Sequence, residues 1–173
     1  MSTIAITIEE LILQTDVAGA PVRLEYVRGR MKWEASPASR HQKALRRIER
    51  AIEPSAGTST GCGCYTLADV LIRFPDPDGS LKRPDIAIFC AEPPDSDEAL
   101  EVLPSAIVEI LSVGYEEKDL GPDGASFYLA YVPEVLVVDP RAGVVHHYRA
   151  DQPPARYTAP ITVDLQCGCR VVL

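Results

Sequence analysis

The sequence predicts an α+β fold, in which a strongly bent and mostly antiparallel sheet is flanked by helices. Strand-like segments separated by turn residues recur along most of the chain. Two early segments show the three- and four-residue apolar spacing of amphipathic helices. The run 106–112 is apolar almost throughout, which is typical of a strand buried on both faces.

A single domain over 1–173 follows from size and composition. Of the 173 residues, 46% are hydrophobic and 24% are charged, which suits one globular core. We expect 1–20 to form an N-terminal helix and linker, and 21–173 to form the core.

The N-terminal part of the chain predicts a helix followed by a hairpin. Thr7 and Glu10 have the spacing of a capping box, so a short amphipathic helix is expected over 7–16. Gly29 can supply the unusual backbone angles of a tight turn between two strand-like segments. The predicted hairpin consists of 22–27, the turn Arg28-Gly29, and 30–34.

A second helix is expected after Pro37, which ends the hairpin. Ser39 is placed to cap this helix, and Pro54 marks its end. Its inner side carries Ala44, Leu45, Ile48 and Ile52, and its outer side carries Arg40, Lys43, Arg46, Arg47 and Arg50. We favour a solvated surface for the basic side over a nucleic-acid contact, because cationic helix faces are common.

The remaining two thirds of the chain predict mainly strands. The turn sequences PDPDGS at 75–80 and DPRAG at 139–143 each join two strands into a hairpin. A helix is expected over 125–131, and an acidic loop over 91–101. The predicted strands are 62–74, 83–90, 106–112, 134–139, 144–149, 161–165 and 170–172.

Net charge and apolar runs limit the partners of this protein. A net charge of −8 excludes broad electrostatic adhesion to phosphate backbones, so any nucleic acid must meet a local basic patch. The apolar runs end far short of the roughly 20 residues that span a bilayer, so no membrane segment is expected. The N-terminal residues lack the features of a secretory signal, which predicts a cytoplasmic protein with reduced cysteines.

Two carboxylates interrupt apolar strands and are the main candidates for chemistry. Asp85 begins the run after Pro84, and Glu109 lies inside the central run. An unpaired buried carboxylate costs several kcal/mol, so a cation, a metal or a hydrogen-bond network must compensate. A divalent cation such as Mg²⁺ suits two carboxylates on neighbouring strands. The structural alternative is that Asp85 caps a turn and Glu109 pairs with Arg73 or Arg83.

An ordered set of short motifs resembles the Uma-two family of restriction endonucleases, within the PD-(D/E)XK nuclease superfamily. The motifs are Leu24-Glu25-Tyr26-Val27-Arg28-Gly29, Ser36-Pro37 with His41, Asp69-Val70, Arg83-Pro84-Asp85-Ile86, Val108-Glu109-Ile110-Leu111-Ser112, Lys118-Asp119-Leu120, Tyr128 and Val137-Val138-Asp139-Pro140. The resemblance implies a restriction-endonuclease-like core that binds Mg²⁺ or Mn²⁺ through Asp85, Glu109 and the carbonyl of Ile110. It also implies hydrolysis of phosphodiester bonds in DNA.

The catalytic lysine of this superfamily is missing from its usual place. It normally lies two positions beyond the second acid, where this chain has Leu111. Members of the family can instead supply a lysine from the following helix, but 121–125 contains none. Lys118 is the nearest substitute and Lys43 is the second, although an exposed lysine is more often surface.

Glu25 and His41 are further site candidates. Glu25 could orient a water or hold a second metal, and His41 could act as a base near neutral pH. Their structural alternatives are a hairpin salt bridge and a hydrogen bond at the start of the helix. For Asp119, capping of the helix that contains Tyr128 is the expected role.

Five cysteines and two adjacent histidines raise the question of a second metal. The steps Cys62-Gly63-Cys64 and Cys167-Gly168-Cys169 could offer four thiolates to Zn²⁺, but zinc pairs typically have two to four intervening residues. We therefore expect four small buried thiols rather than zinc, with Cys90 in the core. His146 and His147 point to opposite faces of a strand and are expected at the surface.

Three functions remain open on sequence grounds. The first is a metal-dependent endonuclease in which another group replaces the motif lysine. The second keeps the fold as an inactive module that binds nucleic acid or protein, which the acidic charge and Leu111 favour. The third is a small structural protein whose buried carboxylates are ion-paired. A homodimer is compatible with each of them.

Overall fold

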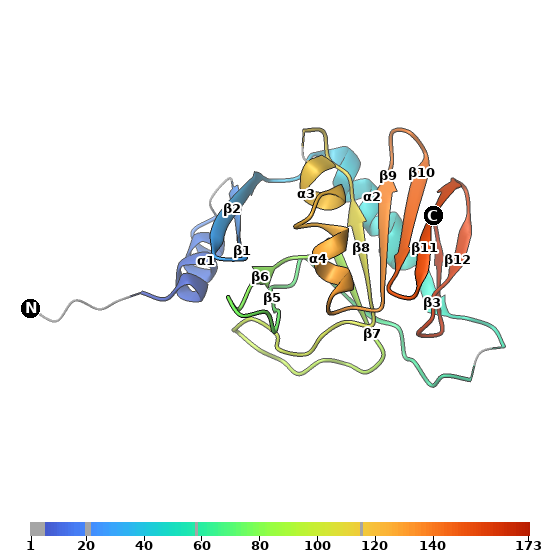
Figure 1. The fold of residues 1–173 in the computed structure, drawn as a ribbon, viewed down its shortest axis with the longest axis horizontal. Helices are drawn as coiled ribbons and strands as arrows, with labels where there is room; N and C mark the ends of the chain where they lie inside the picture. Colours follow the sequence, from blue (N-terminus) through green and yellow to red (C-terminus); the bar gives the residue numbers. More distant parts are fainter. Residues whose placement is uncertain (1–5, 20–21, 58, 115) are drawn as a thin grey trace, which may run out of the picture.

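The computed structural model describes residues 6–19, 22–57, 59–114 and 116–173. A six-stranded sheet is its largest element, with the strand order β11-β10-β9-β8-β7-β4 (Figure 1). These strands are β4 (Tyr65–Ala68), β7 (Ile86–Phe89), β8 (Ala106–Ile110), β9 (Glu134–Asp139), β10 (Val144–Arg149) and β11 (Gln152–Thr158). The pair β8–β9 is parallel and the other pairs of this sheet are antiparallel. The α+β class is confirmed.

Two smaller sheets and four helices complete the described part of the chain. One sheet has the order β2-β1-β6-β5, and the other has the order β12-β13-β3. The four-stranded sheet contains β1 (Val22–Val27), β2 (Arg30–Ala35), β5 (Ile72–Arg73) and β6 (Leu81–Lys82), and the three-stranded sheet contains β3 (Ile52–Pro54), β12 (Thr162–Asp164) and β13 (Cys169–Val172). The helices are α1 (Ile8–Val17), α2 (Ser39–Arg50), α3 (Glu116–Leu120) and α4 (Ala125–Leu129). None of the helices in these ranges is long and apolar enough to cross a membrane.

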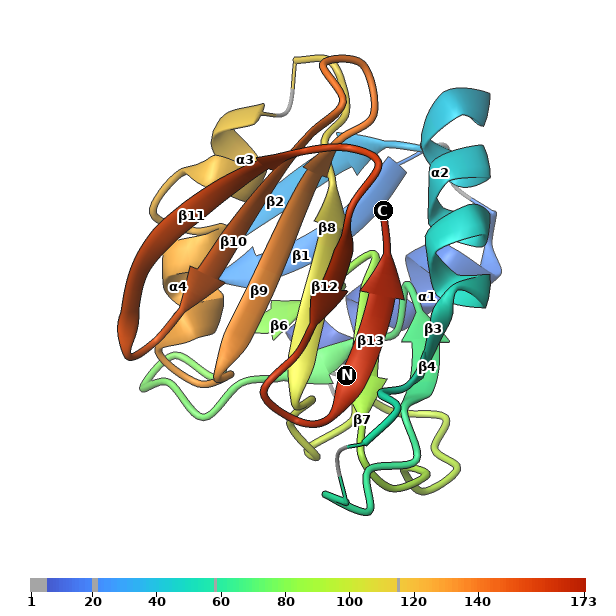
Figure 2. The ribbon, with the colours of Figure 1, turned by 90° about the vertical axis from the view of Figure 1, so that its right-hand side faces the viewer.

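The six-stranded sheet separates two apolar cores. Val108 and Ile110 of β8 belong to a core shared with α2 and the three-stranded sheet. Ile107 and Leu111 belong to a core shared with α4, because successive strand residues face opposite sides. Figure 2 shows α2 and α4 at opposite edges of the view, with β12 and β13 in front of the large sheet. The strand β8 is therefore central and buried, as its apolar run predicts.

The N-terminal elements match their sequence patterns. Thr7 caps α1, because its hydroxyl accepts the N–H of Glu10 and the Glu10 carboxylate accepts the N–H of Thr7. The hairpin β1–β2 turns at Arg28-Gly29, where both residues have positive φ. Ile12 of α1 is buried in a third small core with Leu81.

The predicted hairpin of 62–74 and 83–90 is divided between two sheets. Its outer strands β4 and β7 pair in the six-stranded sheet, whereas β5 and β6 pair in the four-stranded sheet. The chain leaves strand geometry at Asp69, which has a φ of 56°, and at Arg83-Pro84 on the returning side. These two interruptions let one hairpin join both sheets.

Several predicted boundaries were wrong. Ala38 precedes α2 without a side-chain cap, so Ser39 is the first helical residue rather than the cap. Ile52 lies in β3 because the helix ends at Arg50. The helix α3 and the strands β3, β6 and β11 were not predicted. The strand β11 carries two prolines, which an edge strand tolerates because one side of its backbone is unpaired.

Asp123 connects the β1–β2 hairpin to the segment before α4, which leads to a pH-dependent prediction. Its carboxylate accepts hydrogen bonds from Lys32 and from Arg28. Burial opposes the charge on Asp123, but Lys32, Arg28 and Lys82 outweigh burial and lower its pKa. A lowered folded-state pKa stabilises the protein above the unfolded-state pKa, and this contribution disappears as the pH falls through the lowered value.

We therefore expect Asp123→Asn to lower the free energy of unfolding by about 1 kcal/mol at pH 7. The difference from the wild type should vanish at acid pH, when both chains lack this charge. Urea unfolding between neutral and acid pH measures the difference, and the exposed Asp95→Asn is the matched control. A deficit that stays constant down to acid pH would contradict the prediction.

Candidate functional site

Asp85 and Glu109 occupy opposing positions on adjacent antiparallel strands. The register pairs Ile86 with Val108, so Asp85, just before β7, lies opposite Glu109 of β8. The Asp85 N–H donates to Glu109 Oε2 at 3.1 Å. The Ile110 N–H donates to Asp85 Oδ2 at 2.7 Å. Backbone hydrogen bonds thus hold both carboxylates at one end of the large sheet.

His41 approaches the same carboxylate from α2. Its Nε2 lies 3.0 Å from Asp85 Oδ2, and the ring is only 7% exposed. Burial disfavours the charged ring, but the hydrogen bond with Asp85 and the negative charges of Asp85, Glu34 and Asp119 outweigh burial and raise the His41 pKa. The start of α2 thus brings a buried imidazole against one oxygen of Asp85.

A pocket of about 580 Å³ opens over Asp85 and His41. The Asp85 side chain is 21% exposed, whereas Glu109 is buried beneath it. Leu111 also lines the pocket. The charged residues of the lining are Arg23, Glu34, Arg40, Asp69, Asp85 and Arg141. A lining that carries both carboxylates and arginines suits a cation together with an anionic ligand.

Glu25 lies in a buried polar layer beside the two acids. Its Oε1 accepts the Arg83 N–H at 2.7 Å, and its Oε2 is 3.9 Å from Lys82 Nζ. Lys82 is 1% exposed, donates to the Asp123 carbonyl at 2.6 Å, and lies over the Tyr128 ring at 4.5 Å. Burial raises the pKa of Tyr128, and the charges of Glu109 and Glu25 raise it further. Lys82 is therefore a buried cation beside Glu25.

Arg73 and Arg83, the predicted alternative partners of Glu109, form ion pairs with other residues. Arg73 donates to Glu9, and Arg83 donates to Asp16. Both acceptors belong to α1. The proposed pairing of Glu109 with Arg73 or Arg83 is therefore absent from the described ion pairs, and these arginines instead hold α1 against the core.

The lysine candidates differ in position. Lys118 belongs to α3, but its side chain lies outside the part of the chain that the structure describes. Lys43 is exposed on α2 and does not line the pocket. Leu111 is 9% exposed at the position where the superfamily has its lysine. Asp119 lies inside α3, so it cannot be the cap of α4, which is Gly124.

The donor set at Asp85 fits a hard divalent cation. Oδ2 is occupied by His41 and the Ile110 N–H, while Oδ1 accepts no hydrogen bond from any described residue. Glu109 supplies a second carboxylate within contact of the Asp85 backbone. Oxygen ligands from one or two carboxylates, completed by waters and phosphate, are those that Mg²⁺ prefers. Asp85 and Glu109 could therefore hold Mg²⁺ or Mn²⁺, with the Ile110 carbonyl as the third predicted ligand.

Sequence reasoning missed Lys82 and two arginines of the pocket, Arg23 and Arg141. Lys82 stands three residues before Asp85, and its burial was not visible because lysine is normally exposed. Arg23 forms an ion pair with Asp69 at the pocket wall. Arg141 lies in the DPRAG turn after β9, which was predicted as a turn but not as part of the site. The local sequence around these residues does not mark them as part of the site. Their positions become clear only in the folded chain.

His147 is buried, which corrects its predicted surface position. It is 2% exposed, and its Nε2 lies 2.5 Å from Glu134 Oε1. His146 is partly exposed and stacks on Tyr148. Neither imidazole is among the described residues that are grouped closely enough to hold a metal.

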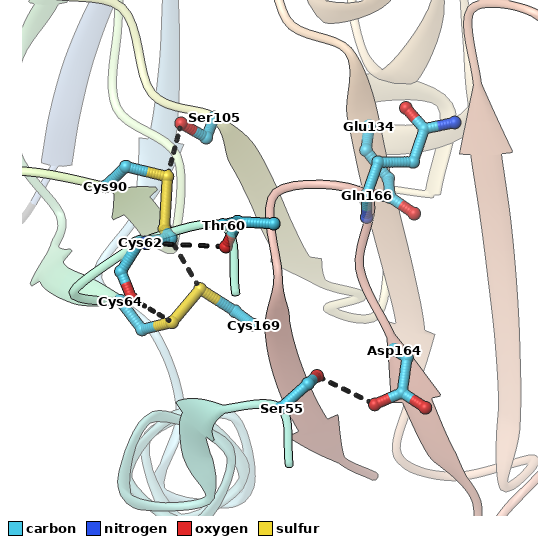
Figure 3. The surroundings of a disulfide bond; sticks show 10 residues. All are labelled: Ser55, Thr60, Cys62, Cys64, Cys90, Ser105, Glu134, Asp164, Gln166 and Cys169. Carbon is cyan, nitrogen blue, oxygen red and sulfur yellow. Dashed lines mark hydrogen bonds between the residues drawn. A yellow bond between two sulfur atoms is a disulfide. The ribbon is translucent and has the colours of Figure 1, made fainter. Parts of the chain in front are cut away.

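The cysteines form disulfide bonds, contrary to the expected reduced thiols. Cys62 is bonded to Cys90 and Cys64 to Cys169 (Figure 3). Cys167 is a free thiol. Both predicted cysteine steps thus converge on one place, together with Cys90. These cysteines come from three separate parts of the chain, so the fold, and not the spacing within one strand, brings them together.

Comparisons with known proteins agree with this architecture. The chain resembles the crystal structure of a putative nuclease belonging to DUF820 from Anabaena variabilis ATCC 29413, with a TM-score of 0.61 and 17% identity over 88% of this chain and 87% of that one. This similarity shows that the fold is restriction-endonuclease-like. Comparison with curated proteins gives no match. The model of the Uma2 family, described as "Putative restriction endonuclease", matches residues 8–166. The chain therefore belongs to the Uma2 family.

Proposed function

We propose that this protein is a Mg²⁺- or Mn²⁺-dependent endonuclease that hydrolyses phosphodiester bonds in DNA. The observation that carries the proposal is the contact of Asp85, which lines an open pocket, with Glu109, which is buried directly behind it. Two adjacent carboxylates in such a position would repel each other unless a cation is shared. Membership of a nuclease family supports this reading of the pair.

The surrounding residues would fix the geometry of the acids. His41 and the Ile110 N–H hold Asp85 Oδ2, which directs Oδ1 to the pocket. Glu25 fixes the start of β7 by accepting the Arg83 N–H, and Lys82 offsets its charge. When bound, the cation would polarise the scissile phosphate and supply an activated water. His41 is placed to act as a base or to orient Asp85.

The DNA would reach the pocket along α2. Arg40 and His41 of this helix line the pocket, and its exposed basic side continues away from it. Arg141 lines the pocket from another part of the chain. Arginine binds phosphate through two parallel hydrogen bonds, so this local patch offsets the acidic charge of the whole chain. A cytoplasmic homodimer, with one site for each DNA strand, belongs to the same proposal.

Leu111 favours a second candidate function, an inactive module that binds nucleic acid or protein. An apolar side chain at the pocket cannot orient a water or stabilise developing negative charge. Catalysis therefore requires Lys118, His41 or another polar group to replace the missing lysine. Without such a group, the same pocket would bind but would not cut.

Plasmid nicking separates the two functions. We expect the purified protein to convert supercoiled plasmid to the open circle with Mg²⁺ or Mn²⁺ and to stop when EDTA is added. Isothermal calorimetry on the same preparation measures binding of the cation without DNA. Binding of Mg²⁺ without nicking would select the inactive module, and the absence of both would reject the metal site.

A further inference from the structure

We propose that the reduced protein binds one zinc ion through Cys62, Cys64, Cys90 and Cys169, far from the acidic pocket. This site goes beyond the proposed nuclease function and does not depend on it. The four cysteines come from the loop before β4, the end of β7 and the start of β13. Figure 3 shows their sulfur atoms in one continuous group.

The spacing of the sulfur atoms suits a soft metal. The sulfurs of Cys62, Cys64 and Cys169 all lie within 4.8 Å of one another, and those of Cys62 and Cys169 are 3.5 Å apart. In a tetrahedral zinc site with Zn–S bonds of about 2.3 Å, neighbouring sulfurs are about 3.8 Å apart. The bonded pairs Cys62–Cys90 and Cys64–Cys169 must therefore separate after reduction. Cys90 is bonded to Cys62 but is not grouped with Cys64 and Cys169, so its sulfur must approach these two after reduction to supply the fourth ligand.

The local backbone is shaped to bring the thiols together. Cys64 has a φ of 52°, an uncommon conformation for a residue other than glycine. A side chain at Gly63 would come within 2.6 Å of Tyr65, and one at Gly168 would come within 2.1 Å of the Thr60 hydroxyl. Tyr65 and Thr60 therefore leave little room for a side chain at the central position of either Cys-Gly-Cys step.

The surroundings also suit thiolates. Cys62, Cys64 and Cys169 are each less than 10% exposed, so water does not compete at the triangle. Ser105 Oγ donates to Cys90 Sγ at 3.4 Å, a contact that stabilises negative charge on sulfur. Cys167 differs, because burial raises its thiol pKa. Its sulfur groups with those of Cys62 and Cys90, but it is less buried than the triangle and takes part in neither disulfide, so the proposed ligand set leaves it out.

The disulfide and zinc forms exclude each other. A phosphine reductant converts each disulfide to two thiols and becomes a phosphine oxide, with water supplying the oxygen and the protons. Two equivalents therefore release all four thiols. Zinc then binds them as thiolates and four protons leave. In either form, the cross-links join the edge of the large sheet at β4 and β7 to β13 of the three-stranded sheet.

Zinc content of the wild-type chain in two redox states is the first test. After reduction with a phosphine, incubation with zinc and removal of excess metal, we expect about one zinc ion per chain. The air-oxidised chain should retain almost none. Replacement of zinc by Co²⁺ should give the absorption bands of tetrahedral thiolate coordination. Equal zinc in both states, or none in the reduced state, would overturn the proposal without any variant being needed.

Cysteine variants test the assigned ligands. Cys64→Ser and Cys169→Ser should each lose at least about tenfold in zinc affinity. Cys167→Ser is the matched control, because it removes a nearby thiol and should leave affinity and the Co²⁺ spectrum unchanged. Circular dichroism of the reduced, metal-free proteins checks that the variants fold. If Cys167→Ser weakens binding as much as Cys64→Ser, the assigned ligand set is wrong.

Discussion

Replacing Asp85 with Asn is expected to lower metal-dependent DNA cleavage by about a thousandfold. The change preserves the size of the side chain, and the amide oxygen can still accept the Ile110 N–H. It removes the negative charge that we propose as the main cation ligand open to the pocket. A loss of about 4 kcal/mol in stabilisation of the transition state corresponds to that factor. The initial rate of plasmid nicking at saturating Mg²⁺ measures the change.

Asp69→Asn is the matched control for this substitution. Asp69 lines the same pocket but pairs with Arg23, and its positive φ is well tolerated by asparagine. We expect nicking within a fewfold of the wild type. Calorimetry should show weaker Mg²⁺ binding only for Asp85→Asn. Undiminished nicking by the Asp85 variant would show that the cut is made elsewhere, or by a contaminant.

Local patterns predicted the first half of the fold because each element carries its own signals. The Thr7 cap and the Gly29 turn are properties of a few neighbouring residues. The division of one hairpin between two sheets was not predictable in this way. It depends on the left-handed backbone at Asp69 and on packing against α1, which no local period encodes.

The residues of the candidate site also differ in how far local sequence identifies them. Asp85 and Glu109 stand out in sequence because a charge inside an apolar run requires a physical reason. His41 could be named, but its contact with Asp85 depends on how α2 crosses the end of the sheet. Lys82 was missed because its burial is created by Phe127 and Tyr128, more than forty residues later in the chain. Long-range partners decide which charged residues are buried.

His147→Ala is expected to cause the largest loss of stability, about 3 to 5 kcal/mol in the free energy of unfolding. Glu134 is 1% exposed, and its carboxylate is held by His147 and by the Gln166 N–H at 2.8 Å. Removing the imidazole leaves a buried negative charge with only the backbone donor among these contacts. Urea unfolding at neutral pH, with all proteins in one redox state, measures the loss.

Two further variants separate the charge pair from simple loss of packing. His146→Ala removes the neighbouring imidazole, which stacks on Tyr148 instead of bonding to Glu134, and should cost about 1 kcal/mol or less. In the double variant Glu134→Gln with His147→Ala, the buried charge is gone, so part of the stability should return relative to His147→Ala alone. The single variant Glu134→Gln completes the comparison. If the loss in free energy of unfolding of the double variant equals the sum of the losses of the two single variants, Glu134 and His147 act independently. The buried pair would then be a packing contact, because a charge left without its partner must produce coupling between the two sites.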